Sequence, residues 1–399
     1  MEIQAEQVRA YRLRGHHLEQ KLPPDALEQA AGACGFQNSP PGAWETAAWN
    51  RVAGCTPASL HAALEEEKRL LQAWSYRGVP VVFPTGQSDV FLTPLAARPG
   101  EQPWIYTRGI TLALEALQMT FDQLLPLVRQ AAAVLDAQTV KSKEELDRVL
   151  AARVEGWLPP EKRPLWNAPS MYGSPDRQTV GGAVVSFMLR PCAFSSLVVF
   201  GRREGGSPTF TSPGRWLGRV PEPCPDADGQ LVRRFLRCYG PATPAALADW
   251  LGCSPQQARR LWGSVESELE PVRFAGKPAY ILAKERAALQ AAAADESRLL
   301  LLGPHDPYLD VRAGRDRALL VQDPARQRLV WRTVANPGCI LKGGRVAGVW
   351  NSKTQAGGIT LALSLFEPLS PGERQALQAL AEQYAAFRSL RLKRCTIET

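Results

Sequence analysis

The chain has 399 residues, of which 45% are hydrophobic and 22% are charged. It is too long for one hydrophobic core, and its composition is that of a globular protein and not of a disordered or collagen-like one. It has no apolar run long enough to span a bilayer and no signal segment at its start, so we expect a soluble, cytoplasmic protein.

The charges and cysteines narrow the choice of partners. Lys and Arg number 47 against 39 Asp and Glu, which gives a formal net charge of +8. Such an excess suits a polyanion, although many basic proteins bind none, so charge alone leaves a nucleic-acid partner open. The eight cysteines are scattered singly, and the chain has only four histidines. We therefore expect neither a disulfide framework nor a metal site, and no cofactor.

Residues 1–108 predict one helical module with a hairpin. The expected helices are Ala5–Arg14, Asp25–Ala31 and Pro57–Trp74, and the expected hairpin pairs Val79–Phe83 with Val90–Leu92. The stretch Gly35–Glu45 is inserted in this module. It places Gln37, Asn38 and Ser39 side by side, and such amides and hydroxyls bond in both directions without titrating.

Residues 109–222 and 223–295 repeat the pattern. The middle copy is built from a helix Phe121–Leu135, a capping pair Ser142 and Glu145, a helix Thr179–Arg190 and a hairpin at residues 202–206. The last copy is the clearest, because Thr243 and Ser254 each cap a helix that a proline opens. Two short strands then flank Ala275–Pro278. Three helices and a hairpin predict a winged helix-turn-helix.

Residues 296–399 have the texture of a sheet. The expected strands are Leu299–Leu302, Arg317–Val321, Leu329–Val334, Ile340–Trp350 and Ile359–Leu365. Five short antiparallel strands at this spacing predict a small β-barrel. Ser370 caps a last helix that runs to Phe387, and the basic tail Arg388–Arg394 is interpreted as a solvated terminus. The predicted fold class is α+β, mostly helical, with three tandem winged helix-turn-helix modules before the barrel.

Several stretches resemble the AlkZ-like (YcaQ-type) winged-helix DNA glycosylases, and together they span most of the chain. They are Arg9-x-x-Arg12-x-Arg14, Gly35–Arg51, Trp74-x-Tyr76-Arg77-Gly78, Tyr239-Gly240-Pro241-Ala242-Thr243 with Trp250, Leu302-x-Pro304-x-Asp306-Pro307-Tyr308-Leu309, and Arg315-Asp316-Arg317. The resemblance implies three winged helices and a barrel in a C shape around a channel for double-stranded DNA. It also implies excision of bulky alkylated purines or unhooking of interstrand crosslinks.

The family's catalytic motif is Gln, one residue, then Gln or Asp. Gln37 matches its first member and Asn38 its middle residue, but Ser39 replaces the second member and is too short to reach as far as glutamine. A second departure is Val79–Val82, which replaces the family's usual Thr-x-His after Arg77-Gly78. The resemblance therefore supports DNA binding more firmly than catalysis.

The reaction can be argued from the residues. An N7-alkylated purine is cationic and leaves readily, so its cleavage mainly needs a placed water and stabilisation of an oxocarbenium-like sugar. Gln37 would hold the water, and Asn38 or Ser39 would complete its coordination. The alternatives are that Gln37 ties the loop backbone and that Ser39 with Pro40 only caps a helix. Asp306 is a second candidate activator, unless it only caps the turn at Pro307.

Two functions from different classes remain open. One is a monofunctional DNA glycosylase for bulky or crosslinking N-alkylated purines, and the other is a non-catalytic winged-helix regulator or damage binder. Both need DNA contacts, for which the candidates are Arg12, Arg14, His16, His17, Arg77, Arg202, Arg203, Arg259 and Arg260. We expect a monomer without a protein or membrane partner.

Overall fold

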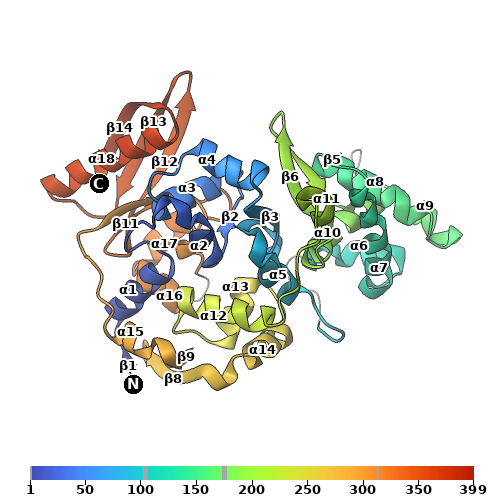
Figure 1. Ribbon diagram of the computed structural model, residues 1–399, viewed down its shortest axis with the longest axis horizontal. Helices are drawn as coiled ribbons and strands as arrows, with labels where there is room; N and C mark the ends of the chain where they lie inside the picture. Colours follow the sequence, from blue (N-terminus) through green and yellow to red (C-terminus); the bar gives the residue numbers. More distant parts are fainter. Residues whose placement is uncertain (1, 102–106, 173–177, 312–313) are drawn as a thin grey trace. The chain divides into compact units, whose positions relative to one another are not determined.

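The computed structural model describes residues 2–101, 107–172, 178–311 and 314–399 (Figure 1). The chain divides into two compact units. Unit 1 consists of Met1–Ala63, Val232–Trp250 and Trp262–Thr399, and unit 2 consists of Leu64–Leu231 and Leu251–Leu261. Each helix in the described ranges is too short or too polar to cross a membrane.

The N-terminal part of unit 1 is helical. Its elements are β1 (Glu2–Ile3), α1 (Ala5–Gly15), α2 (Leu27–Gly32), β2 (Phe36–Gln37), α3 (Ala43–Arg51) and α4 (Pro57–His61). Thr56 caps α4 by accepting a hydrogen bond from the backbone of Ser59, as its sequence position predicts. The prediction of one helix from Pro57 to Trp74 is wrong in its second half. Lys68 has a φ of 55°, which ends the helical path, and a strand follows.

Unit 2 begins with a hairpin of β3 (Leu70–Trp74) and β4 (Pro80–Pro84). The strand predicted at Val79–Phe83 is therefore confirmed, but its partner is the preceding segment. Val90–Leu92, which was predicted to pair with it, belongs to helix α5 (Ser88–Leu92). The apolar run of β3 could be a helix or a strand by periodicity alone, and its antiparallel pairing with β4 decides for a strand.

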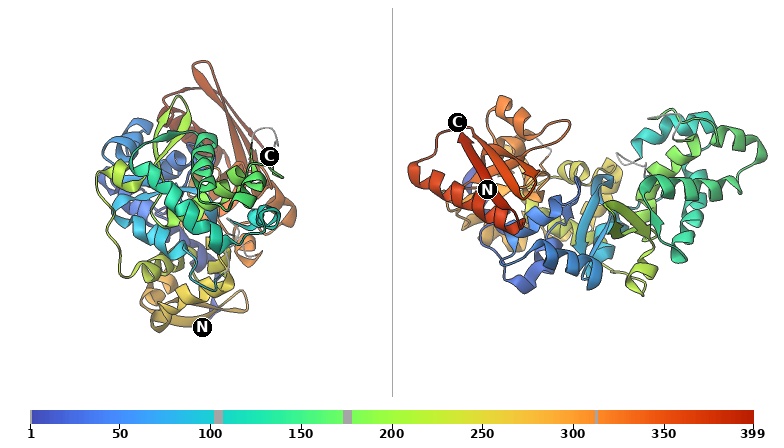
Figure 2. Two further views of the ribbon diagram at one scale, coloured as in Figure 1. Left: turned by 90° about the vertical axis from the view of Figure 1, so that its right-hand side faces the viewer. Right: turned by 90° about the horizontal axis from the view of Figure 1, so that it is seen from above.

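The rest of unit 2 is a helical bundle with a second hairpin (Figures 1 and 2). Its elements are α6 (Thr111–Leu117), α7 (Phe121–Ala132), β5 (Val140–Lys141), α8 (Lys143–Glu155), α9 (Arg163–Trp166), α10 (Val180–Phe194), β6 (Val199–Glu204), β7 (Ser207–Thr211) and α11 (Pro213–Leu217). The ring of Trp74 stacks on Phe210 at 5.3 Å and so packs β3 against β7. Gly181 lets α10 pack closely against Trp166 of α9, because a Cβ at position 181 would lie 2.2 Å from the ring of Trp166.

The stretch from Ala227 to Leu282 contains the predicted three helices and hairpin, and its residues are divided between the two units. The elements are α12 (Ala227–Tyr239), α13 (Pro244–Leu251), α14 (Pro255–Gly263), β8 (Leu269–Phe274) and β9 (Lys277–Leu282), and α15 (Arg286–Gln290) follows. The hydroxyls of Thr243 and Ser254 accept hydrogen bonds of 3.2 and 3.1 Å from backbone amides in the first turns of α13 and α14. Both predicted caps are confirmed.

A five-stranded sheet forms the C-terminal part of unit 1. Its strands are β10 (Leu299–Leu302), β11 (Gly338–Lys342), β12 (Arg345–Gln355), β13 (Gly358–Leu365) and β14 (Arg391–Glu398), in that spatial order. Only the β13–β14 pair is parallel. Because β10 and β14 lie at opposite edges of this sheet, it is open, and the prediction of a closed barrel is wrong.

Two of the predicted strands are not strands. Arg317–Val321 falls mainly in the helix α16 (Gly314–Leu320). Leu329–Val334 covers the end of the helix α17 (Pro324–Val330) and continues as irregular chain. Asp323 caps α17 by accepting a hydrogen bond from the amide of Ala325. An Asp-Pro start signal at this position was therefore present in the sequence and was overlooked.

The predicted solvated tail is also part of the fold. Helix α18 (Pro371–Phe387) is confirmed with its Ser370 cap, and it crosses back so that β14 pairs parallel with β13. The basic residues of β14 therefore belong to a regular strand. The physical reason is the free edge of β13, whose backbone groups find their hydrogen-bond partners in β14.

Candidate functional site

Gln37 ends the short strand β2 and is 9% exposed. Its side-chain nitrogen donates a 3.2 Å hydrogen bond to the carbonyl of Ser39. The preceding Phe36 is buried, and the guanidinium of Arg51 lies 5.5 Å from the centre of its ring. The packing of Phe36 and the hydrogen bond to the Ser39 carbonyl therefore hold Gln37 in position.

Asn38 closes the turn that follows. Its side-chain oxygen accepts a 2.7 Å hydrogen bond from the amide of Gly42, and helix α3 begins at Ala43. The predicted helix start at Ser39 and Pro40 is wrong. Pro41 keeps Pro40 out of the helical region, so α3 starts only after both prolines. Ser39 is half-buried and is not the helix cap.

Gln37 lines a cavity of about 340 Å³ within unit 1. The other lining residues come from one later part of the chain: His305, Leu309, Asp310, Val311, Arg317, Val330, Trp331, Arg332, Thr333, Asn336, Pro337 and Cys339. This volume is within the range of small-molecule pockets, and about half of the lining residues are polar or charged. The indole of Trp331 faces the guanidinium of Arg317 at 5.2 Å and donates to the carbonyl of Leu309 at 2.9 Å, which holds it in place.

Asp306 lies behind this wall. Its two oxygens accept hydrogen bonds of 2.8 and 2.7 Å from Arg51, and one of them also accepts from the amide of Tyr308 at 3.0 Å. The alternative interpretation of Asp306 as a turn cap is therefore confirmed. Asp306 is buried and does not line the cavity, whereas His305 and Asp310 on either side of it do. Asp310, four positions after Asp306, therefore lies in the same cavity wall as Gln37. The sequence did not predict this carboxylate as a site residue.

Two of the four candidate DNA contacts near α1 lie in the interior of unit 1. Arg12 is 2% exposed and donates to the carbonyls of Tyr239 and Gly240 and to the carboxylate of Asp316, at 2.7, 3.1 and 2.7 Å. His16 is 1% exposed. In these positions they join chain segments and do not present a surface to a duplex.

The other two lie nearer to the surface. Arg14 is exposed and forms a 3.0 Å ion pair with Glu19. His17 is half-buried, and burial together with the positive charge of Arg51 lowers its pKa. A neutral His17 would contact phosphate only through a hydrogen bond.

The three candidates in the stretch Leu64–Leu231 of unit 2 differ in how far their side chains are engaged by other protein groups. The guanidinium of Arg77 lies 4.9 Å over the ring of Tyr76 and is half-buried. Arg202 and Arg203 are exposed on β6, and Arg202 lies 3.4 Å from a carboxylate oxygen of Glu65. A phosphate would have to compete with Glu65 for Arg202.

The two arginines of α14 are not equivalent. Arg259 is exposed, whereas Arg260 is half-buried and forms ion pairs of 2.7 Å with Glu101 and 2.9 Å with Asp228. Arg260 therefore has a role in holding unit 2 together. Arg259 is the member of the pair that is open to solvent.

The family model described as "DNA glycosylase AlkZ-like" matches residues 30–387. The chain belongs to the AlkZ-like DNA glycosylase family. An interstrand DNA cross-link repair glycosylase of Streptomyces sahachiroi is 26% identical over 394 residues, which cover 95% of this chain and 94% of that protein. The solved structure of DNA glycosylase AlkZ from Streptomyces sahachiroi matches with a TM-score of 0.76 and 23% identity over 100% of both chains. The mixed α+β fold of the family member described here is therefore shared with AlkZ.

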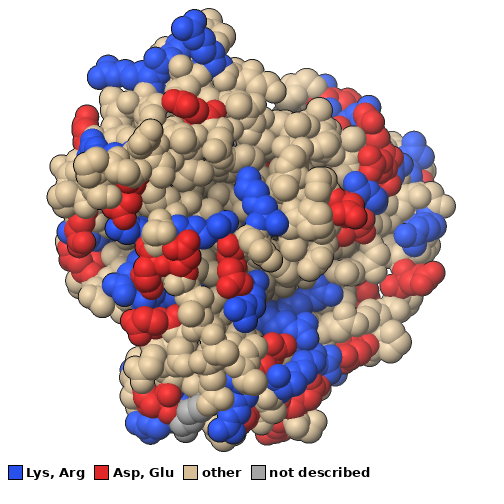
Figure 3. Space-filling model, turned by 60° about the vertical axis from the view of Figure 1, so that its left-hand side comes forward, with Lys and Arg blue, Asp and Glu red and all other residues tan. Residues whose placement is uncertain are grey.

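This AlkZ-like chain also carries a basic row on its C-terminal sheet, which joins Lys353 of β12 to Arg394 of the predicted tail. The register places Lys353 of β12 beside Thr360 of β13, and Thr360 beside Arg394 of β14. Side chains in register on neighbouring strands lie on the same face of a sheet. Lys353 and Arg394, which form this basic row, are both exposed. In Figure 3 basic side chains gather at the top of the molecule. The sign of this patch in the sequence was the run Arg388–Arg394.

Proposed function

We propose that this AlkZ-like glycosylase is monofunctional and hydrolyses the N-glycosidic bond of bulky or crosslinking N-alkylated purines of the N7-alkylguanine type in double-stranded DNA. The observation that carries the proposal is Gln37, whose neutral amide lines a cavity of about 340 Å³ that has room for a purine. The name of the Streptomyces sahachiroi relative, an interstrand DNA cross-link repair glycosylase, supports the same class of lesion.

The proposed chemistry follows from the charge of the substrate. A purine alkylated at N7 is already cationic, so the leaving group needs no general acid. Gln37 would orient the attacking water, and Asp310 in the same wall would accept its proton and face the positive charge that develops on the sugar. None of the described residues that line the cavity is a lysine, which favours hydrolysis over a Schiff-base route.

The neighbours of Gln37 have supporting parts in this proposal. Asn38 closes the turn, and the carbonyl of Ser39 accepts the hydrogen bond that orients the Gln37 amide. Asp306 holds Arg51 and thereby α3. Ser39 replaces the family's Gln or Asp, so the second motif position has no long side chain. In this proposal Asp310, from another chain segment, supplies the oxygen that binds the water.

DNA binding is proposed to use three winged-helix modules in residues 1–108, 109–222 and 223–295, followed by the sheet of residues 296–399. Arg14, His17, Arg77, Arg202, Arg203 and Arg259 would contact the backbone, together with the basic row of the sheet. Arg12, His16 and Arg260 would act indirectly, since their present partners are protein groups. Phosphate contacts of this kind fix position without reading sequence.

The test is single-turnover excision from a duplex with one bulky N7-alkylguanine, scored as alkali-labile abasic sites. Gln37→Ala should lower the excision rate by about 100-fold or more, and Asp310→Asn by about 10-fold or more, with DNA affinity and melting temperature retained. Gln130→Ala, on the exposed face of α7, is the matched control and should excise as fast as the parent. A parent that binds the duplex and releases no base would overturn the proposal in favour of a DNA-binding protein without catalysis.

A further inference from the structure

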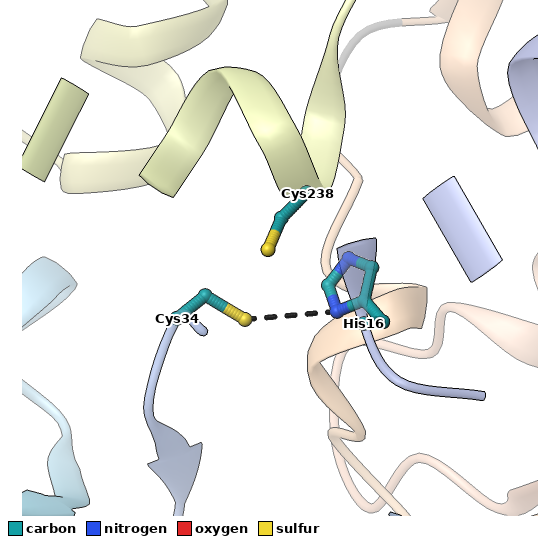
Figure 4. A group of neighbouring side chains, drawn as sticks. All are labelled: His16, Cys34 and Cys238. Atoms are coloured by element: carbon teal, nitrogen blue, oxygen red, sulfur yellow. Dashed lines mark hydrogen bonds between the residues drawn. The ribbon is translucent and has the colours of Figure 1, made fainter. Parts of the chain in front are cut away.

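Three side chains that do not line the cavity of Gln37 converge in the interior of unit 1 (Figure 4). His16 follows the C-terminal end of α1, Cys34 lies between α2 and β2, and Cys238 lies near the end of α12. All three are buried, and one nitrogen and two sulfur atoms lie within 4.8 Å of one another. In Figure 4 the imidazole and both thiol groups point toward a common centre.

The distance between Cys34 and His16 suits two ligands of a tetrahedral metal ion. With Zn–S of about 2.3 Å and Zn–N of about 2.0 Å, two ligands of one zinc ion are separated by roughly 3.5 to 3.8 Å. The Sγ of Cys34 lies 3.6 Å from Nδ1 of His16. The Sγ of Cys238 lies 3.5 and 3.6 Å from the carbonyl oxygens of Gly15 and Ala33, to which the thiol can donate.

Two aromatic rings fix the orientation of the His16 imidazole. Its ring meets the rings of Tyr239 and Tyr308 nearly at right angles, with centroids 5.0 and 5.5 Å away. The Nε2 atom is buried and has no hydrogen-bond partner in the part of the chain that the structure describes. The polar contact of the ring is made by Nδ1, which faces the Sγ of Cys34.

The charges also favour a cation. Burial alone would raise the pKa of Cys34, but the hydrogen bond with Cys238 and the charges of His16 and Arg51 bring it well below its usual range. The same hydrogen bond, with burial, raises the pKa of Cys238. Thiolates are the form in which cysteine binds metals.

A cation at this point meets little repulsion. Arg51 is neutralised by Asp306 at 2.7 Å and Arg12 by Asp316 at 2.7 Å. Two thiolates and a neutral imidazole would balance the charge of a divalent ion.

We infer that His16, Cys34 and Cys238 bind a thiophilic divalent cation, for which Zn²⁺ is the probe. Binding of the ion releases the proton of any ligand thiol that is not yet ionised. The site has a structural role, because none of its three residues lines the cavity that Gln37 faces. The site joins the ends of α1 and α12 to Cys34, which lies three residues before Gln37. Whether the ion binds can be tested independently of the proposed excision reaction.

The test begins with protein stripped by a chelator and a reductant. Addition of Zn²⁺ should load one equivalent per chain by elemental analysis and raise the melting temperature by several degrees. Co²⁺ should bind in its place and give thiolate-to-cobalt charge-transfer absorption in the near ultraviolet. Cys34→Ser and Cys238→Ser should abolish both signals, and Cys395→Ser, a cysteine of the same unit on β14, should retain them.

If either cysteine variant fails to fold, zinc and cobalt titration of the parent alone gives the answer. A parent with less than a tenth of an equivalent of zinc, no cobalt absorption and no change in melting temperature would overturn the inference in favour of a packed thiol cluster. A Cys34–Cys238 disulfide in freshly purified protein, seen as a loss of two mass units, would overturn it as well.

Discussion

Arg51 and Asp306 face each other through two parallel hydrogen bonds of 2.8 and 2.7 Å, and both side chains are almost fully buried. Arg51 ends α3, the helix that follows the Gln37 turn, while Asp306 precedes the segment that carries Asp310. The pair therefore ties together the two chain segments that form the wall of the cavity.

Breaking this pair should be costly. Arg51→Met leaves a buried carboxylate without its partner, and we expect a loss of about 3 to 5 kcal/mol in the free energy of unfolding, measured with urea. Asp306→Leu should cost a similar amount. The double variant should recover much of the loss, because an apolar pair leaves no buried charge. A loss below about 1 kcal/mol in either single variant would show that the pair is not structural.

Asn38 and Ser39 make a matched pair of variants. Asn38→Ala removes the acceptor for the Gly42 amide, so we expect a loss of about 1 kcal/mol in stability and slower excision through a displaced Gln37. Ser39→Ala keeps the carbonyl that binds Gln37, and its stability should change by no more than about 0.5 kcal/mol. Thermal unfolding and single-turnover excision of both variants check this. The reverse order of stabilities would restore Ser39 as the cap.

The salt dependence of DNA binding should identify the phosphate contacts. Replacing Lys353 and Arg394 with Ala should weaken binding to all duplex sequences alike and reduce the slope of log K against log salt by about two. The Arg202→Ala, Arg203→Ala double variant should act in the same sense but less strongly, because Arg202 already faces Glu65. Fluorescence anisotropy at several salt concentrations measures both.

Two results would contradict this assignment. An effect confined to one duplex sequence would mean that these residues read base edges. An equal effect from Arg148→Ala, an exposed arginine of α8 paired with Glu145, would mean that the slope reports only net charge.

Glu45 should make stability depend on pH. Burial opposes its ionisation, but His61 at 2.9 Å and Arg388 outweigh burial and lower its pKa from the ordinary value of 4.5. The folded protein therefore holds this proton less tightly than the unfolded chain does. The stabilisation is present above pH 4.5 and is lost as the pH falls from there through the folded pKa.

The variant that shows this is Glu45→Gln. Its urea unfolding should differ from the parent by about 2 kcal/mol at pH 6, and the difference should shrink toward zero at about pH 3. Glu382→Gln on the exposed side of α18 is the control and should show a small difference at both pH values. A constant difference for Glu45→Gln would mean that its charge plays no part.

The sequence predicted those parts of the fold whose signals are local. The caps at Thr243 and Ser254 and the last helix from Ser370 depend on residues within one turn, and all are observed. The partner of β4 and the pairing of β14 depend on segments that periodicity cannot relate to one another. They were accordingly predicted wrongly.

The same division applies to the site. Gln37 could be singled out from its neighbours in the chain, but Asp310 joins it only through tertiary folding. The spacing of His16, Cys34 and Cys238 matches no metal motif, since 18 residues separate the first two and 204 the last two. Proximity created by folding is invisible to a search for short motifs.

The bond between Arg12 and Asp316 has a consequence for the order in which the protein matures on the ribosome. These residues are 304 positions apart, and Arg12 also binds the carbonyls of residues 239 and 240. Arg12 can therefore complete these contacts only after more than three quarters of the chain has been synthesised. Unit 2 takes most of its residues from one continuous stretch, Leu64–Leu231, which emerges earlier. We therefore expect the middle of the chain to collapse around its own core during translation, before the N-terminal segment meets its partners.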